Sequence, residues 1–427
     1  CNAIPGSLFT TAAAREYAAA GTATIEGALS ALEQAGLIST NLAGPHPVIQ
    51  VSWLVQAAVR AAMADGTLKG AAAAAADALL EVWPADDQPE WLARSMRSSA
   101  ESLRRAAGDL LWEGGCHDLL VRTGQSLEAA RLIAPCAGYW GELTSVSSRV
   151  LGRGHPVTLM IQERFARASL AAGRTSESVA LYELVRNDRA HRLGPDHPDT
   201  AATSRDLGRA LVAAGRLGDA VTVLEGAISS YERSLGTGSI EEMAAREDLA
   251  AAHRAADRFA EAIALYQLTL RHRERVQGAR HLDTMATRQK LAETYLADGN
   301  AKQAISHYKR LAADREQVFG ADHLYTLAAR GALGSAYHAA GRMASALQLY
   351  EQTRAEYVRT LGADHPDTLA AGVNLAQIYC TVGRLTDAEN LLRDTVTRCE
   401  RNLPPGDPMT ASAQSTLATI IGGGEDA

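Results

Sequence analysis

Histidine recurs in this sequence at a regular spacing, and it is the residue type best suited to metal binding. The recurring copies stand at intervals that are multiples of 42 residues: His155, His197, His281, His323 and His365. A zinc ion needs its ligands about 2 Å away, whereas equivalent positions on successive packed helices are separated by roughly 8 to 10 Å. These side chains therefore cannot meet at one ion. We predict that they mark the starts of helices, and we predict no metal site.

Motifs for catalysis are missing from the sequence. No Gly-Lys pair exists, so the phosphate-binding loop G-x-x-x-x-G-K-[ST] cannot form. Ser306 and Lys309 match S-x-x-K but lack the K-T-G partner of that nucleophile motif. Cys380 has no histidine beside it in the sequence, and no pair of carboxylates stands in an apolar setting. We therefore predict no catalytic residue and no cofactor.

Composition and charge narrow the function classes. The chain has 427 residues, of which 47% are hydrophobic, and no apolar run approaches the about 20 residues that a bilayer-spanning helix needs. The net charge of −7 argues against nucleic acid or an anionic membrane as the partner. The five cysteines are odd in number and never spaced as C-x-x-C, so no disulfide framework is expected. These features favour a cytoplasmic protein.

The elements that position these residues repeat every 42 residues. Apolar residues recur at helical spacing over 207–214 and again over 220–228, which predicts two amphipathic helices in each unit. A glycine marks the same register in six units: Gly152, Gly194, Gly236, Gly278, Gly320 and Gly362. One helical hairpin cannot bury its apolar stripe alone, so neighbouring hairpins must stack. The sequence predicts an all-α protein, a right-handed α-solenoid with a long inner groove.

Residues 361–392, LGADHPDTLAAGVNLAQIYCTVGRLTDAENLL, resemble the tetratricopeptide repeat in its 42-residue, kinesin-light-chain-like form. The resemblance assigns residues 151–421 to the solenoid and leaves 422–427 as a flexible tail. One unit departs from the pattern, with Ser239 where histidine is expected. A degenerate earlier repeat, residues 124–150, is expected to begin near Gly124 with the turn and second helix of a unit.

The region before the repeats has a different composition, because all five tryptophans lie there. Residues 24–37 form an amphipathic pattern, followed by a turn-rich stretch and a second helix expected from about Ser52. With LFTTAAAREY before it and WLVQAAVRAA after it, this segment resembles the winged helix that follows the nucleotide-binding domain in bacterial signalling ATPases of the STAND or NB-ARC type. We expect a winged-helix-like module over residues 1–66 and a helical connector over 67–123.

A winged helix can also bind DNA, which would make the protein a transcription regulator. The helix expected over residues 24–37 carries Glu26 and Glu33 and no lysine or arginine. Phosphate contacts need cations, so this alternative is the weaker one.

In tetratricopeptide proteins the first helix of each unit lines the concave side, and the resemblance carries that property over to particular residues here. The candidate groove residues are Arg164, Arg167, Arg205, Arg209, Glu247, Arg254, Gln289, Lys290, Glu293, Ser335, His338, Asn374 and Gln377. The arginines can form paired hydrogen bonds with carboxylates, and the later residues offer amides and hydroxyls. The alternative is that the arginines pair with Glu163, Asp206, Glu247 and Asp248 of neighbouring repeats and only hold the solenoid together.

The resemblance implies a non-catalytic sensor or interaction module. It would bind a partner protein or an extended, partly acidic peptide in the groove and regulate an upstream NTPase switch. The chain begins with Cys1 rather than Met, and we expect it to be part of a longer protein. A self-associating scaffold without a switch, and hence a homo-oligomer, is the second possibility.

Overall fold

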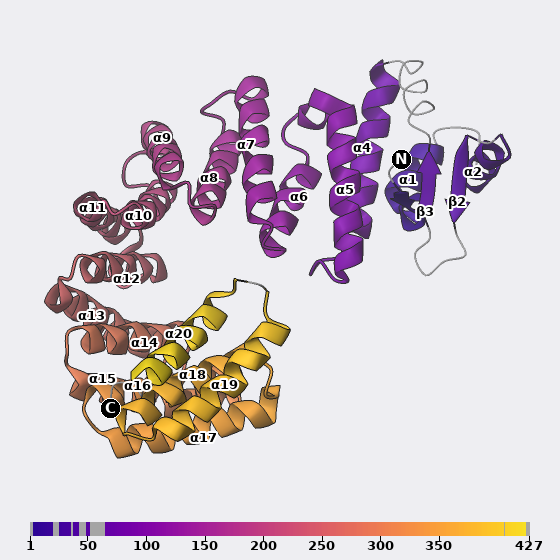
Figure 1. Ribbon diagram of the computed structural model, residues 1–427. Coiled ribbons are helices and arrows are strands. Elements are labelled where there is room, and N and C mark those ends of the chain that lie inside the picture. Colours follow the sequence, from indigo (N-terminus) through magenta and orange to yellow (C-terminus); the bar gives the residue numbers. More distant parts are fainter. Residues whose placement is uncertain are drawn as a thin grey trace. The chain divides into compact units, whose positions relative to one another are not determined.

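The structure is a computed structural model that describes residues 3–19, 25–35, 37–41, 48–51, 65–404 and 406–423. The chain falls into two compact units, Cys1–Gly215 and Arg216–Ala427, and each is described by itself. Consecutive α-helices make up most of both units (Figure 1). No helix in the described parts is long and apolar enough to cross a bilayer.

The first unit begins with a small sheet and two helices. Strands β1 (Ala3–Pro5), β2 (Ile38–Asn41) and β3 (Val48–Val51) form an antiparallel sheet in the order β1-β3-β2. Helices α1 (Ala12–Ala19) and α2 (Ile25–Gln34) lie between β1 and β2 in the sequence, and the short 3₁₀ helix η1 (Gly6–Thr10) precedes α1. Ile49 in the central strand is buried and lies opposite Ile4 on one side and Thr40 on the other.

The all-α architecture that the sequence predicts is confirmed, and the small N-terminal sheet is a minor addition to it. Its strands are only three or four residues long, and β-branched residues favour the extended backbone there. The amphipathic pattern over residues 24–37 corresponds to α2, so that expectation is confirmed. The helix expected from Ser52 lies outside the described residues.

The helical region that precedes the regular repeats packs around tryptophans. It comprises α4 (Asp65–Val82), α5 (Glu90–Ala107), the 3₁₀ helix η2 (Gly108–Trp112), α6 (Asp118–Ala129) and α7 (Ile133–Val150). Trp112 and Trp140 are buried in its core together with Leu119. The expectation of a turn near Gly124 is wrong, because Gly124 lies within α6. A Cβ atom at Gly124 would overlap the ring of Trp140, so this glycine serves close packing.

The repeats follow as pairs of helices, and we call the first helix of each pair the A helix and the second the B helix. In the first unit the A helices are α8 (Pro156–Ala171) and α10 (Pro198–Ala213), with the B helix α9 (Thr175–Leu193) between them. In the second unit the B helices are α11 (Leu217–Leu235), α13 (Phe259–Val276), α15 (Ala301–Phe319), α17 (Met343–Leu361) and α19 (Leu385–Asn402). Its A helices are α12 (Ile240–Ala255), α14 (Leu282–Ala297), α16 (Leu324–Ala339), α18 (Pro366–Thr381) and α20 (Pro408–Gly423).

Consecutive helices pack against each other within each unit, which confirms the predicted stacking of helical hairpins. The turn from A to B helix needs a left-handed backbone: Gly341 has φ 70°, and Asp257, which replaces glycine in its repeat, has φ 56°. Tyr350 fills the space beside Gly334, where an added Cβ would lie 3.0 Å from its ring. The flexible tail expected over 422–427 overlaps the end of α20, which continues to Gly423.

Candidate functional site

The recurring histidines start the A helices, as the sequence predicts. Each is an N-cap whose Nδ1 accepts a hydrogen bond from the backbone N–H two residues later, at 3.2 Å for His155 and 3.2 Å for His365. Ser239 caps α12 with its hydroxyl oxygen instead, accepting from the N–H of Glu242 at 3.3 Å. The described residues contain no group of three or more His, Cys, Asp or Glu that could hold a metal ion.

The thiols lie in environments that disfavour the reactive thiolate. Burial raises the pKa of Cys136 to about 11 and that of Cys116 to about 12. Burial also raises the pKa of Cys380. These thiols are therefore neutral at pH 7.

The A helices carry a partly exposed strip that we call the A-helix face. It consists of residues that stand in register, by multiples of 42, with Arg164, Arg167 or Leu170. Its polar members are Arg164, Arg167, Asp206 and Arg209 in the first unit, and Asp248, Arg254, Lys290, Glu293, Ser335, His338, Asn374, Gln377, Thr416 and Thr419 in the second. Ten of the thirteen candidate groove residues belong to this face.

The other three candidates, Arg205, Glu247 and Gln289, stand in register with Glu163, one position earlier on the A helix. Three side chains of this column, Glu163, Glu247 and Gln289, lie beside B-helix arginines 26 residues later. Arg189 donates to Glu163 at 2.9 Å, and Arg315 donates to Gln289 at 2.7 Å. These positions hold the hairpin together, and Glu247 is only 6% exposed.

In the first unit the arginines of the A-helix face differ in how closely they approach their partners. Arg164 donates to Glu128 at 3.1 Å and lies 5.5 Å from the centre of the Trp140 ring. Arg167 and Arg209 both lie beside the carboxylate of Asp206, at 3.5 and 3.6 Å. Both side chains are 57% exposed, so their guanidinium groups remain accessible to solvent.

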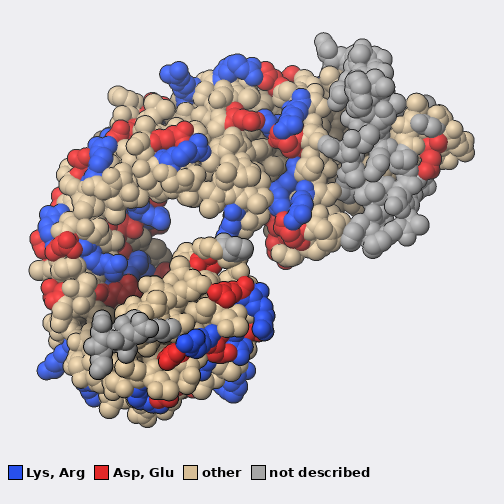
Figure 2. Space-filling model, viewed as in Figure 1, with Lys and Arg blue, Asp and Glu red and all other residues tan. Residues whose placement is uncertain are grey.

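In the second unit, ion pairs connect α12 to α14. Lys290 donates to Glu247 at 2.9 Å, and Arg254 lies 3.3 Å from Glu293. On the viewed face of the molecule cations and anions are interleaved rather than gathered into one patch of a single sign (Figure 2). Pairing between neighbouring repeats, the alternative that the sequence left open, is therefore present for these residues.

Towards the end of the chain the A-helix face becomes neutral. The Ser335 hydroxyl lies 2.6 Å from the Tyr350 hydroxyl, and His338 is half-buried. Asn374 and Gln377 are exposed, and their amides form no hydrogen bond within the described parts of the chain.

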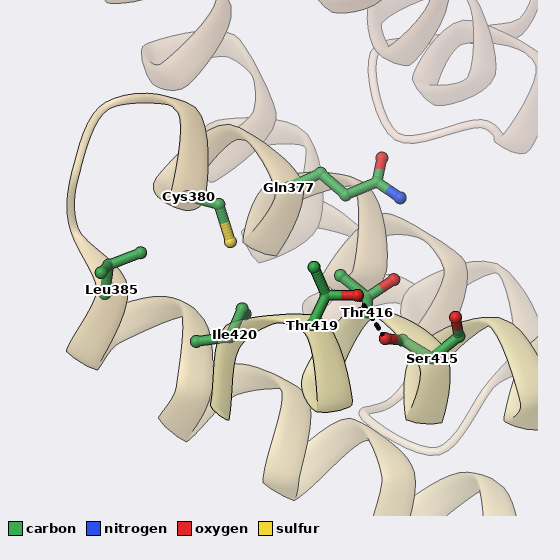
Figure 3. A pocket seen from close by; sticks show the side chains of 7 residues that line it. All are labelled: Gln377, Cys380, Leu385, Ser415, Thr416, Thr419 and Ile420. Atoms are coloured by element: carbon green, nitrogen blue, oxygen red, sulfur yellow. Dashed lines mark hydrogen bonds between the residues drawn. The ribbon is translucent and has the colours of Figure 1, made fainter. Parts of the chain in front are cut away.

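A hollow of about 450 Å³ lies at this neutral end, between α18 and α20 (Figure 3). It is lined by Gln377, Cys380, Leu385, Ser415, Thr416, Thr419 and Ile420. Of these lining residues, the sequence analysis identified only Gln377 as a site residue. The 42-residue repeat could have identified two more, because Thr416 and Thr419 stand 42 residues after Asn374 and Gln377.

Comparisons with known proteins agree with this architecture. A family model described as "Tetratricopeptide repeat" matches residues 157–233, 241–317, 290–355 and 340–401, more than half of the chain. The TPR-like repeats of a putative kinesin light chain from Podosopora anserina are 26% identical, with a TM-score of 0.45, over 48% of this chain and 97% of theirs. No curated protein matches the chain.

A longer protein is similar over almost the whole chain. It is a STAND signal transduction ATPase with a tetratricopeptide repeat sensor, from Pyrococcus horikoshii, and it matches 98% of this chain at 13% identity with a TM-score of 0.55. This chain spans 57% of that protein's length. At this identity the likeness shows a shared fold alone.

Proposed function

Because the chain belongs to the tetratricopeptide repeat family, whose members are generally protein-interaction modules, we propose that it binds an extended segment of a partner protein along the A-helix face and performs no chemistry of its own. The observation that carries this proposal is the neutral end of the face. Asn374 and Gln377 are exposed, with amides that form no hydrogen bond within the described residues. Side-chain amides of this kind can donate to and accept from the backbone of a bound peptide.

In the first unit, the same proposal assigns Arg167 and Arg209 to acidic side chains of the partner. Both side chains lie beside the carboxylate of Asp206, at the long distances of 3.5 and 3.6 Å, and both are 57% exposed. A carboxylate from the partner would form shorter, charge-assisted hydrogen bonds with either guanidinium group. Arg254, Lys290 and Glu293 are engaged with each other or with Glu247, so they are the less available part of the face.

We further propose that binding regulates a nucleotide-driven switch on a longer protein. The strand order β1-β3-β2 around α1 and α2 suits a winged-helix-like module, and it supports this part of the proposal. So does the coverage of 98% of this chain by a STAND ATPase with a repeat sensor.

Peptide selection tests the binding proposal. The full chain is used to select from a display library of random 12-residue peptides, and the affinity of the winners is measured by fluorescence anisotropy. We expect Gln377→Arg to weaken binding by about tenfold, because it places a long charged side chain on the neutral face. Thr397→Arg is the matched control, at an exposed position of the B helix α19, and should leave affinity within about twofold. Equal losses in the two variants, or the absence of any binding peptide, would contradict the proposal.

A further inference from the structure

At the hollow between α18 and α20, two short side chains stand where an earlier repeat of the same unit has an ion pair. On α12 and α14 the corresponding positions hold Arg254 and Glu293, whose side chains meet at 3.3 Å across the space between the A helices. Cys380 and Thr419 occupy the same positions three periods of 42 residues later. Neither side chain is long enough to close the space, and the Cys380 thiol points towards α20 (Figure 3).

The threonines on α20 present hydrogen-bond acceptors to the hollow. Thr416 donates its hydroxyl proton to the carbonyl of Ser412 at 2.9 Å, and Thr419 donates to the carbonyl of Ser415 at 2.9 Å. A hydroxyl has one proton and two acceptor lone pairs. Both hydroxyl protons are therefore donated within α20. The hydroxyl oxygens can still accept hydrogen bonds from a ligand. A peptide N–H is the donor that fits this requirement.

The remaining lining is apolar or uncharged. Leu385 is 51% exposed although it is a large aliphatic residue, and Ile420 lies across from it on α20. No charged side chain lines the hollow among the described residues. A charged group bound here would lose hydration without gaining an opposite charge. The hollow therefore selects against charged ligand groups.

We propose that this hollow binds one bulky apolar side chain of the partner segment, while backbone N–H groups beside that side chain donate to Thr416 and Thr419. A volume of about 450 Å³ lies within the range of about 300–1,000 Å³ typical of ligand pockets. The inference rests on the proposed function and adds an anchor residue to it. In this unit the face thus has an ion-paired part on α12 and α14 and an apolar anchor site on α18 and α20.

Methyl NMR of the full chain tests the anchor site with defined probes. N-acetyl-leucinamide and N-acetyl-aspartamide carrying a free side-chain carboxylate are each titrated into protein labelled at its leucine and isoleucine methyl groups. We expect the leucine derivative to shift the Leu385 and Ile420 methyl signals in a saturable manner at millimolar concentration, and the aspartate derivative to bind about tenfold more weakly or not at all.

Variants locate the response. Ile420→Arg, which fills the hollow, should abolish the Leu385 shift, whereas Leu282→Arg at a residue 59% exposed on α14 should leave it unchanged. Thr419→Val keeps the shape of the side chain and removes one hydrogen-bond acceptor. It tests the site independently in case Ile420→Arg does not fold, and it should weaken binding of the leucine derivative by about threefold or more.

The outcomes separate this inference from the proposed function. Selected peptides that depend on Gln377 but leave the Leu385 and Ile420 methyls unmoved would overturn the anchor site while the peptide-binding face stands. Equal shifts with the leucine and aspartate derivatives, or no shift with either, would overturn the anchor site as well. A leucine-specific shift in a chain that selects no 12-residue peptide would overturn the binding of extended segments while the anchor site stands.

Discussion

Buried or half-buried arginines connect neighbouring helices in the second unit. They stand one period apart on the A helices, and each reaches a carboxylate 14 residues earlier on the preceding B helix. The repeated contacts are Arg246 with Glu232, Arg288 with Glu274 and Asp314, and Arg330 with Glu316 and Glu356. Arg288 is fully buried, with carboxylate oxygens at 2.7 and 2.5 Å. These arginines thus have a structural role that the composition of the chain alone does not reveal.

Replacing Arg288 with methionine should destabilise the second unit by about 3–5 kcal/mol, because Glu274 and Asp314 would lose their buried partner. The matched control is Arg393→Met. Arg393 pairs with Glu389 at 2.7 Å on an exposed face, and its loss should cost less than about 1 kcal/mol. Urea unfolding followed by helical circular dichroism measures both. Midpoints lowered equally in the two variants would show that the buried contacts carry no special weight.

Asp87 in the first unit combines burial with two strong donors. Trp83 donates its indole N–H at 2.8 Å and Arg122 donates at 2.6 Å. Burial by itself raises the pKa of Asp87, but hydrogen bonds from Trp83, Arg122 and Ser126 together with the charge of Arg122 outweigh burial and lower that pKa below 3.8. A lowered folded-state pKa means that the stabilisation is fully present above the unfolded-state pKa and is lost as pH falls through the folded-state pKa.

Asp87→Asn should therefore destabilise the first unit at neutral pH by about 1–3 kcal/mol, since the charge-assisted hydrogen bonds weaken. The gap in free energy of unfolding between wild type and variant should narrow as pH falls below 3.8 towards the lowered folded-state pKa, at which wild-type Asp87 also becomes neutral. Thermal unfolding followed by tryptophan fluorescence at several pH values measures the gap. A gap that stays constant down to pH values well below 3.8 would mean that the charge of Asp87 is not what stabilises the site.

At the scale of helices, the repeats were predictable because their boundaries have chemical signals. A histidine that precedes five of the A helices accepts a backbone hydrogen bond, and glycines such as Gly341 supply the left-handed turn from A to B helix. The strands of the N-terminal sheet lacked such signals, since Ala3–Pro5 is three residues long and pairs only with a distant segment. Non-local pairing of so short a segment leaves little periodicity in the sequence.

The site was predictable only in part for a similar reason. The period assigned residues to A helices, but successive residues on a helix point about 100° apart. Glu247 and Lys290 therefore differ in role by one position in the register: Glu247 is turned towards the B helix and buried, and Lys290 is half-exposed. The side of the A helix that packs against its B helix depends on tertiary contacts. The 42-residue spacing alone therefore could not predict it.

Two glycines within helices give opposite expectations for the same substitution. Gly124→Ala in α6 should destabilise the first unit by at least about 1–3 kcal/mol, because the new Cβ overlaps the buried ring of Trp140. Gly226→Ala in α11 should stabilise the second unit by about 0.5–1 kcal/mol, because no atom lies within 4 Å of its Cβ position and alanine favours helix. Thermal unfolding of both variants measures the effects, and a shift of the same sign in both would contradict the assignment of Gly124 to close packing.

For the whole molecule, stability follows from contacts between neighbouring helices. Within the second unit each helix packs mainly on the helix before it and the helix after it. Leu311 of α15 is fully buried in a cluster with Tyr308, Leu291 and Leu333, which come from α14, α15 and α16. A cavity at Leu311 therefore removes contacts from three helices directly and from the rest only through them.

Leu311→Ala should cost about 2–5 kcal/mol locally, and in a stacked array the loss should decay along the chain rather than spread evenly. Hydrogen exchange of the full chain, followed by mass spectrometry, should show the largest loss of amide protection in α14, α15 and α16, a smaller loss in α18, and none in α8 and α9. Leu282→Ala, at a leucine 59% exposed on α14, should change little. An equal loss of protection in every helix would mean that the whole chain opens as one cooperative body, and binding at one end of the A-helix face would then stabilise all repeats together.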